Sequence, residues 1–187
     1  LCLPTAHVGG LSILARCREV GAGIVCVPDF EPDGIIDAID RRRASLASFV
    51  PTMLRRILDG CPDWSTPAHL RAVLVGGAAT PPTLVAEARR RGLPLLLTWG
   101  LTEAGSQVCT QDPTRPLSLA EHDLQTCGRP LAGFEVTTRD GRLHVRGRAV
   151  SRTWFPAEAH PLGDDGYLPT NDAGFLTPPG DVRVSGR

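Results

Sequence analysis

One apolar run that ends in polar and small residues constrains the fold of this chain more than any other feature. Residues 93–97 (LPLLL) form a short, fully apolar run, which is typical of a buried strand in a parallel sheet. The run is followed at once by Thr98, Trp99 and Gly100, and then by further hydroxyl, carboxylate and small residues: Thr102, Glu103, Gly105 and Ser106. Ligands of open α/β sheets bind at the carboxyl ends of such strands. The stretch therefore predicts a ligand site, with an ordinary exit into a turn as the alternative.

The residue types in this stretch, and in one other, suit a phosphorylated ligand. Hydroxyls donate hydrogen bonds to phosphate oxygens, and Glu103 can hold a hard cation such as Mg²⁺. A second small-residue loop, Gly76-Gly77-Ala78, follows an expected strand and precedes an expected helix that opens with two prolines. Such a loop before a helix N-terminus can bind an anion or a nucleotide, although most loops of this kind are only tight turns.

Strand-like and helix-like runs alternate from residue 1 to about residue 108. This alternation predicts an α/β fold built from parallel βαβ units with right-handed crossovers. We expect strands at residues 1–3, 24–27, 46–50, 70–75 and 93–97, and helices at residues 11–20, 32–43, 53–58 and 81–91. Thr52 precedes one of these helices, and we expect it to cap that helix.

The pattern changes in the last third of the chain. Residues 109–126 predict a surface connection, and alternating runs on either side of Asp140-Gly141 predict a β-hairpin. Further short strands are expected at residues 166–168, 174–176 and 182–184. The sequence therefore predicts an α/β subdomain over residues 1–112 and a small β-rich subdomain, a distorted barrel, over residues 113–187.

Composition excludes several classes of function. The formal net charge is zero, which gives no electrostatic basis for binding nucleic acid or an anionic membrane. No apolar run reaches the length of a membrane span. Six scattered cysteines, without a C-x-x-C pair or a signal peptide, favour free thiols in a reducing cytoplasm. Neither end resembles a natural terminus, so we expect a fragment, and a homo-oligomer is left open.

The motif Thr98-Trp99-Gly100-Leu101-Thr102-Glu103 resembles the (Y/W)G-x-TE motif of the acyl-adenylate-forming enzymes, which include acyl-CoA synthetases, adenylation domains and luciferases. The similarity is especially marked to the o-succinylbenzoate–CoA ligases of menaquinone biosynthesis. It rests on LPTAHVGGLSILAR (3–16), FVPTMLRRILD (49–59), LRAVLVGGAATPP (70–82) and TWGLTEAGSQV (98–108). Gly128-Arg129-Pro130, LHVRG (143–147), YLPTND (167–172) and Gly186-Arg187 resemble later phrases of the superfamily, up to its hinge.

The resemblance implies a two-step reaction and a set of site residues within the large N-terminal domain of such an enzyme. A carboxylic acid reacts with ATP to give an acyl-adenylate, and CoA then displaces AMP to give the thioester. Glu103 would hold Mg²⁺ and Thr102 would bond the α-phosphate, while His7 would lie at the acyl pocket. The nucleotide site would include Gly76, Gly77, Ala78, Thr98, Trp99, Gly100, Asp172 and Arg187, with Trp99 stacked on adenine and Asp172 and Arg187 on the ribose. Donors for the acid substrate would be Thr52, Ser106 and Gln107.

Two features depart from the expected pattern, and other classes remain open. The chain contains no lysine, so it supplies neither the phosphate-loop nor the lid ammonium group; we expect the chain alone to bind nucleotide weakly and not to turn over. Asn171 replaces a usual glycine, which leaves the neighbouring turn in question. The alternatives are a peptide-synthetase adenylation domain, which the apolar Gly9-Gly10-Leu11 disfavours, another acyl- or aryl-CoA synthetase, a non-catalytic nucleotide-binding relative, and an unrelated α/β binding module.

Overall fold

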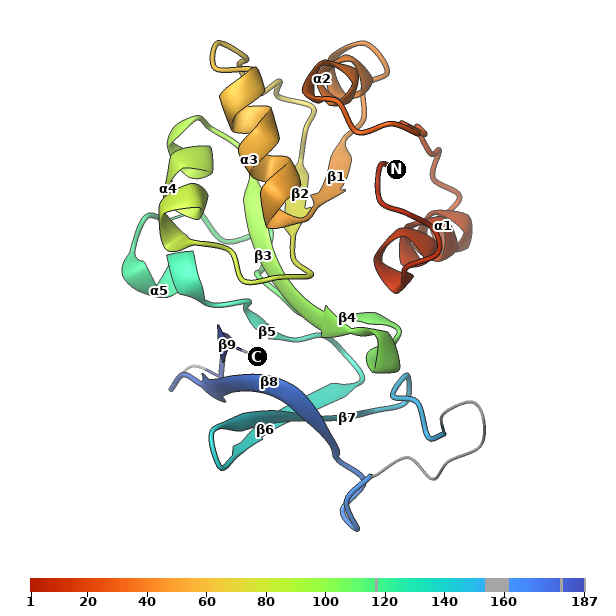
Figure 1. Cartoon of the computed structure of the whole chain (residues 1–187), viewed down its shortest axis with the longest axis vertical. Helices are drawn as coiled ribbons and strands as arrows, with labels where there is room; N and C mark the ends of the chain where they lie inside the picture. Colours follow the sequence, from red (N-terminus) through yellow and green to blue (C-terminus); the bar gives the residue numbers. More distant parts are fainter. Residues whose placement is uncertain (117, 154–161, 179, 187) are drawn as a thin grey trace.

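Two sheets form the frame of the molecule in the computed structural model, which describes residues 1–116, 118–153, 162–178 and 180–186. The first sheet has the strand order β1-β2-β3-β4-β5, and the second has the order β6-β7-β8-β9. Figure 1 shows the helices gathered around the first sheet, with the second sheet curled below it. The expected fold class, an α/β part followed by a β-rich part, is confirmed. The division at residue 112 stays a prediction.

The elements have the following bounds. The strands are β1 (Leu46–Phe49), β2 (Ala72–Val75), β3 (Leu95–Leu101), β4 (Ser106–Thr110), β5 (Arg129–Pro130), β6 (Phe134–Arg139), β7 (Arg142–Gly147), β8 (Leu168–Leu176) and β9 (Val182–Gly186). The helices are α1 (Val8–Val20), α2 (Pro32–Asp40), α3 (Pro51–Gly60), α4 (Pro82–Arg90), the 3₁₀ helix η1 (Thr102–Ala104) and α5 (Glu121–Gln125). None of the described helices is long and apolar enough to cross a membrane.

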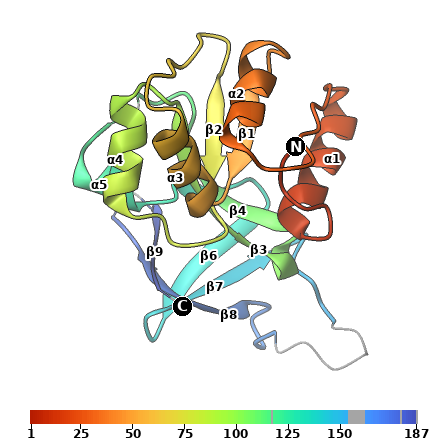
Figure 2. The same ribbon diagram turned by 45° about the horizontal axis from the view of Figure 1, so that its top comes forward.

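Helices α3 and α4 cover one face of the parallel strands, as Figure 2 shows. Alternate strand residues point to this face, where Val73, Val75 and Leu95 are fully buried in one cluster with the apolar sides of both helices. On the opposite face Leu74 is half-buried, and Leu46 at the edge of the sheet is 57% exposed. The core of the α/β part therefore lies on the helical side of the sheet.

The central strand is longer than its apolar run, and the parallel pattern ends with it. β3 continues through Thr98 to Leu101 because it pairs with the antiparallel β4, with Leu101 opposite Ser106. The prediction that residues 109–126 form a surface connection is wrong at both ends, since Cys109 is a buried strand residue and α5 lies within the stretch. Burial against the second sheet, which the local sequence does not show, makes Cys109 part of the core.

Three local predictions near the N-terminus are also wrong. No regular strand forms at residues 1–3 or 24–27. The two segments bond to each other, since the Val27 N–H donates to the Leu1 carbonyl and the Leu1 amino group to the Val25 carbonyl. Thr52 is not the cap of α3, because Pro51, which has no N–H to be capped, opens that helix and Thr52 lies exposed in the first turn.

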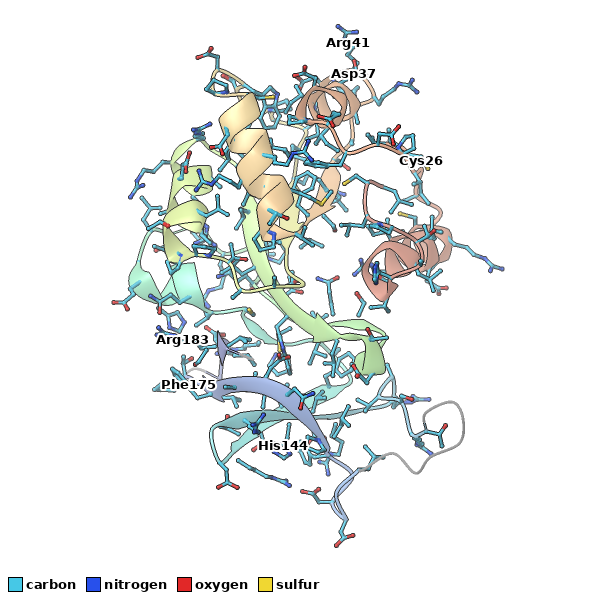
Figure 3. The ribbon with its side chains drawn as sticks, in the orientation of Figure 1. Cys26, Asp37, Arg41, His144, Phe175 and Arg183 are labelled. Carbon is cyan, nitrogen blue, oxygen red and sulfur yellow. The ribbon has the colours of Figure 1, made fainter. Side chains whose placement is uncertain are left out.

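The second sheet contains the predicted hairpin. Asp140 (φ 49°) and Gly141 (φ 73°) join β6 to β7 with both residues in the left-handed region, as a tight two-residue turn requires. The short runs expected at residues 166–168 and 174–176 are wrong as separate strands, because cross-strand bonding to β7 and β9 makes β8 one continuous strand of nine residues. His144, labelled in Figure 3, lies on β7 and is half-buried, and this burial lowers the pKa of its imidazole.

We expect Gly100→Ala to lower the free energy of unfolding by about 1–3 kcal/mol, because an added Cβ forces the backbone apart. That Cβ would lie 1.8 Å from the Ser106 carbonyl oxygen. Gly34→Ala in α2 is the control, since the added Cβ would meet only the Val27 side chain, at 3.7 Å. Alanine should stabilise this helix relative to glycine, which loses more backbone entropy on folding. Urea unfolding of both variants measures the difference, and a Gly100→Ala chain as stable as wild type would contradict the fold of this hairpin.

The cysteines should differ sharply in reactivity. All six are free, as predicted. Cys26 is exposed near the N-terminus (Figure 3), whereas Cys109 is fully buried and burial raises the pKa of its thiol. Since the thiolate is the reactive form, a disulfide reagent at pH 8 should modify Cys26 quickly and Cys109 only on unfolding. Cys26→Ser should remove a fast phase that Cys109→Ser leaves intact; equal rates at the two thiols would refute the buried position of Cys109.

Candidate active site

The hairpin from β3 through η1 to β4 carries most of the residues that the sequence singles out. Gly105 (φ 72°) ends η1, and Ser106 follows with a φ of 123°, which is unusual for a residue with a side chain. Gly100 packs its backbone against the Ser106 carbonyl, where no side chain fits. Strained backbone of this kind often lies at functional sites, where the surrounding structure holds it in place.

A second group of predicted residues lies at the carboxyl edge of the parallel strands. The strands end in register, with Phe49 beside Val75 and Val75 beside Leu97, so the residues that follow them share one edge. These residues are Thr52 after β1, Gly76, Gly77 and Ala78 after β2, and Thr98 in β3. A Cβ on Gly76 would lie 2.4 Å from Thr98 Oγ1, so the small loop and the hydroxyl are in direct contact. The edge offers a backbone surface with exposed Gly77 and Ala78.

Trp99 and Asp172 are brought together from opposite sheets. The indole Nε1 of Trp99 in β3 donates to Oδ2 of Asp172 in β8 at 2.9 Å. Trp99 is 6% exposed and Asp172 is 8% exposed. Much of the Trp99 ring is covered by the apolar cluster that joins the hairpin to the second sheet. Asp172 therefore lies beside the β3 motif, and little of the Trp99 ring is exposed.

Thr102 and Glu103 form the tip of the hairpin. Thr102 is exposed and Glu103 is half-buried. The backbone of Glu103 is fixed, since its carbonyl accepts a 2.7 Å hydrogen bond from the Ser151 N–H. Within the described part of the chain its carboxylate has no hydrogen bond or ion pair. No group of three or more metal-binding side chains exists among those residues. One available carboxylate suits Mg²⁺ when a nucleotide supplies further oxygens.

A polar cluster joins α1 to the start of β4. Arg16 donates to the Gln107 side-chain carbonyl and, through Nη2, to Ser12 Oγ at 3.2 Å. Ser12 Oγ lies 3.2 Å from Ser106 Oγ, and Gln107 Nε2 donates to Thr110 Oγ1 at 2.9 Å. Partial desolvation lowers the pKa of Arg16, but a guanidinium stays charged at neutral pH. The cluster adds a cation to the two predicted donors Ser106 and Gln107.

Sequence reasoning missed Ser12 and Arg16. Their spacing of four residues places both on one face of α1, which a helical pattern can show. Only the tertiary structure shows that this face lies across β4.

The remaining predicted residues are dispersed. His7 is the residue before α1 (φ −100°, ψ 147°), and its exposed side chain makes no capping hydrogen bond. Its imidazole is therefore accessible to a ligand. Arg187 lies outside the described residues. Thr52 is at the sheet edge but makes no side-chain hydrogen bond in the described part of the chain.

Comparison with known proteins supports the resemblance found in the sequence. The chain is 30% identical over 198 residues to the 2-succinylbenzoate–CoA ligase of Bacillus cytotoxicus, and 31% identical to that of Bacillus mycoides. Each alignment covers 100% of this chain and 40% of the relative. The chain therefore spans less than half the length of the curated relatives that it matches.

Solved structures agree with these relatives. The o-succinylbenzoate CoA synthetase of Bacillus subtilis with a product analogue matches with a TM-score of 0.88 at 29% identity, over 100% of this chain and 40% of that one. The same enzyme with its acyl-adenylate intermediate matches with a TM-score of 0.87 at 29% identity, over 98% of this chain and 39% of that one. An amide bond synthetase from Marinactinospora thermotolerans matches with a TM-score of 0.84 at 27% identity, over 99% of this chain and 40% of that one.

A family model decides the assignment. The model described as AMP-binding enzyme matches residues 1–154, which include the small-residue loop at the sheet edge and the whole β3–η1–β4 hairpin. Since this match covers well over half of the chain, the chain belongs to the AMP-binding enzyme family.

Proposed function

We propose that this chain acts in an ATP-dependent acid–CoA ligase that converts o-succinylbenzoate to its CoA thioester through an acyl-adenylate. One observation carries the proposal: the likeness to 2-succinylbenzoate–CoA ligases runs through 100% of the chain at 30% identity. It therefore includes the hairpin, the sheet edge and the Asp172 strand. Structures of such an enzyme are known with AMP and with ATP and magnesium ion, which supports the nucleotide part of the proposal.

The nucleotide would lie between the sheet edge and the second sheet. Gly76, Gly77 and Ala78 present backbone to the adenine and the acyl group. The Asp172 carboxylate accepts hydrogen bonds from the ribose hydroxyls, because a carboxylate has enough lone pairs for a vicinal diol in addition to Trp99. Stacking of adenine on Trp99 would use the small part of the ring that is exposed. Arg187 would add a donor to the ribose.

The hairpin tip would hold the phosphates. Thr102 donates its hydroxyl to the α-phosphate, and Glu103 is the residue that would hold Mg²⁺, which neutralises phosphate charge when bound. Thr98 contacts the Gly76 backbone at the sheet edge, and Gly100 packs against the Ser106 carbonyl within the hairpin. Displacement at phosphorus depends on positioning and charge neutralisation more than on covalent help, and a fixed backbone at Glu103 meets the first need.

The polar cluster between α1 and β4 would bind the acid substrate. o-Succinylbenzoate has two carboxylates, and the one that does not react needs a cation or strong donors. Arg16 supplies the cation, with Ser106 and Gln107 as neighbouring donors. His7 at the start of the same helix and Thr52 at the sheet edge would complete the acyl pocket.

Asp172→Asn should weaken the binding of a non-hydrolysable o-succinylbenzoyl-adenylate analogue by at least about tenfold, since bonds to a charged acceptor are lost. Asp164→Asn, at an exposed carboxylate, should leave affinity unchanged. Calorimetric titration of this chain measures both variants beside AMP and an aminoacyl-adenylate analogue. Selective binding of the aminoacyl analogue would instead favour a peptide-synthetase adenylation domain. No selective binding by folded chain would count against the proposed substrate.

Arg16→Gln should weaken the binding of the o-succinylbenzoyl-adenylate analogue by about tenfold and leave the binding of a benzoyl-adenylate analogue unchanged. The reason is that only the first analogue has a second carboxylate. Arg18→Gln on the same helix is the matched control. Equal losses for both analogues would show that Arg16 supports the fold rather than the substrate.

The chain alone should not form a CoA thioester, since it has no lysine for the two ammonium groups that the resemblance implies. Incubation with ATP, Mg²⁺, CoA and o-succinylbenzoate, followed by mass detection of the thioester, checks this expectation. Thioester formation at a rate typical of the relatives would contradict it. Formation of an amide with an added amine, as in an amide bond synthetase, would point to a different acceptor.

A further inference from the structure

A buried hydrogen bond joins two residues that the proposed function places in one nucleotide site. Trp99 and Asp172 are 73 residues apart in the sequence, and their bond of 2.9 Å runs from β3 of the first sheet to β8 of the second. In Figure 1, β3 descends from the helical part of the molecule toward β8. Both side chains are more than nine-tenths buried, so water does not compete freely for either group.

The bond holds the Asp172 carboxylate in one orientation. On the backbone side, the Asp172 N–H donates to Thr170 Oγ1 at 3.1 Å, and the Thr170 hydroxyl donates to the Leu143 carbonyl at 2.8 Å. On the side-chain side, the indole fixes Oδ2. A group whose rotation is already restricted loses less entropy when a ligand binds, so it binds more tightly. The indole therefore prepares the carboxylate for a diol.

The identity of residue 99 matters to this bond. The indole N–H is a donor only, so Asp172 must be the acceptor. Phenylalanine has a ring of similar character but no donor. The motif that this chain resembles allows Tyr or Trp, and a phenol carries its hydroxyl at the far end of the ring, where it cannot replace Nε1 without a shift of the ring.

We propose that Trp99 is a positioning residue, which orients the Asp172 carboxylate through its indole N–H and so sets the preference for a ribonucleotide over a nucleotide without ribose hydroxyls. This inference rests on the proposed function, because it takes Asp172 as the group that accepts from the ribose. Any contact of the Trp99 ring with adenine is separate, since it acts equally on nucleotides with and without the hydroxyls.

The hydrogen bond can be tested without any nucleotide. Trp64 offers an internal control, since its Nε1 donates to both carboxylate oxygens of Asp40 at 3.1 and 3.3 Å. In ¹H–¹⁵N spectra of the chain, Asp172→Asn should move the indole resonance of Trp99 and leave that of Trp64 in place. Asp40→Asn should do the reverse. If Asp172→Asn leaves the chemical shift of the Trp99 indole unchanged, the hydrogen bond does not exist and the proposal is overturned.

The effect on selectivity is measured by titrating the chain with AMP and with 2′,3′-dideoxy-AMP, following backbone amide resonances. Wild type should bind AMP at least about tenfold more tightly, which is the contribution expected of hydrogen bonds to a charged acceptor. Trp99→Phe should reduce that ratio by about tenfold through weaker AMP binding, with dideoxy-AMP affinity nearly unchanged. Trp64→Phe, which also removes an indole–carboxylate bond, should keep the wild-type ratio.

The outcomes separate this inference from the function on which it rests. If Trp99→Phe weakens the binding of both nucleotides by the same factor, Trp99 acts through its ring or through the fold, and the proposal is wrong. If wild type prefers AMP and Trp99→Phe keeps that preference, the inference fails while the ribose role of Asp172 stands. If wild type binds the two nucleotides equally, or neither of them, the proposed nucleotide site fails and the inference fails with it.

Discussion

The close contact of β3 with β4 at Gly100 is the constraint on which the candidate site depends. The strands approach so closely there that a single Cβ would overlap the Ser106 carbonyl. This contact forces the turn at η1 and the unusual backbone of Ser106, and it thereby fixes the direction in which Thr102 and Glu103 leave the sheet. A looser hairpin would leave these side chains to many orientations, at an entropic cost to any ligand that had to order them.

The same hairpin joins the two halves of the molecule. Its inner side chains, Trp99, Val108 and Cys109 among them, share one apolar cluster with Leu143 and Val145 of the second sheet. Backbone bonds close the junction: the Cys127 N–H donates to the Val182 carbonyl at 2.7 Å, and the Val182 N–H donates to the Gly128 carbonyl at 2.8 Å. The second sheet is thus held against the first, and Asp172 is brought to the carboxyl end of β3.

Part of this arrangement could be predicted from the sequence. The Asp140-Gly141 hairpin, the helices from α1 to α4 and the parallel strands have local signals, since periodicity and turn residues lie within a few positions of each other. The antiparallel turn of β4 and the single long β8 could not be predicted, because both depend on pairing with distant strands. The same holds for the candidate site. Residues 98–103 form one continuous motif that the sequence shows, whereas the place of Arg16 in the site depends on the packing of α1 across β4.

The sequence by itself determined the family, the small-residue loop at residues 76–78 and the hydroxyl and carboxylate groups that follow the central strand, because these are consecutive residues whose chemistry is read directly. Only the tertiary structure decided that Asp172 accepts from Trp99 and that Ser106 and Gln107 have a guanidinium beside them. The physical reason is distance along the chain: hydrogen bonds between residues far apart in sequence exist only after the burial of apolar side chains has brought the two sheets and α1 together.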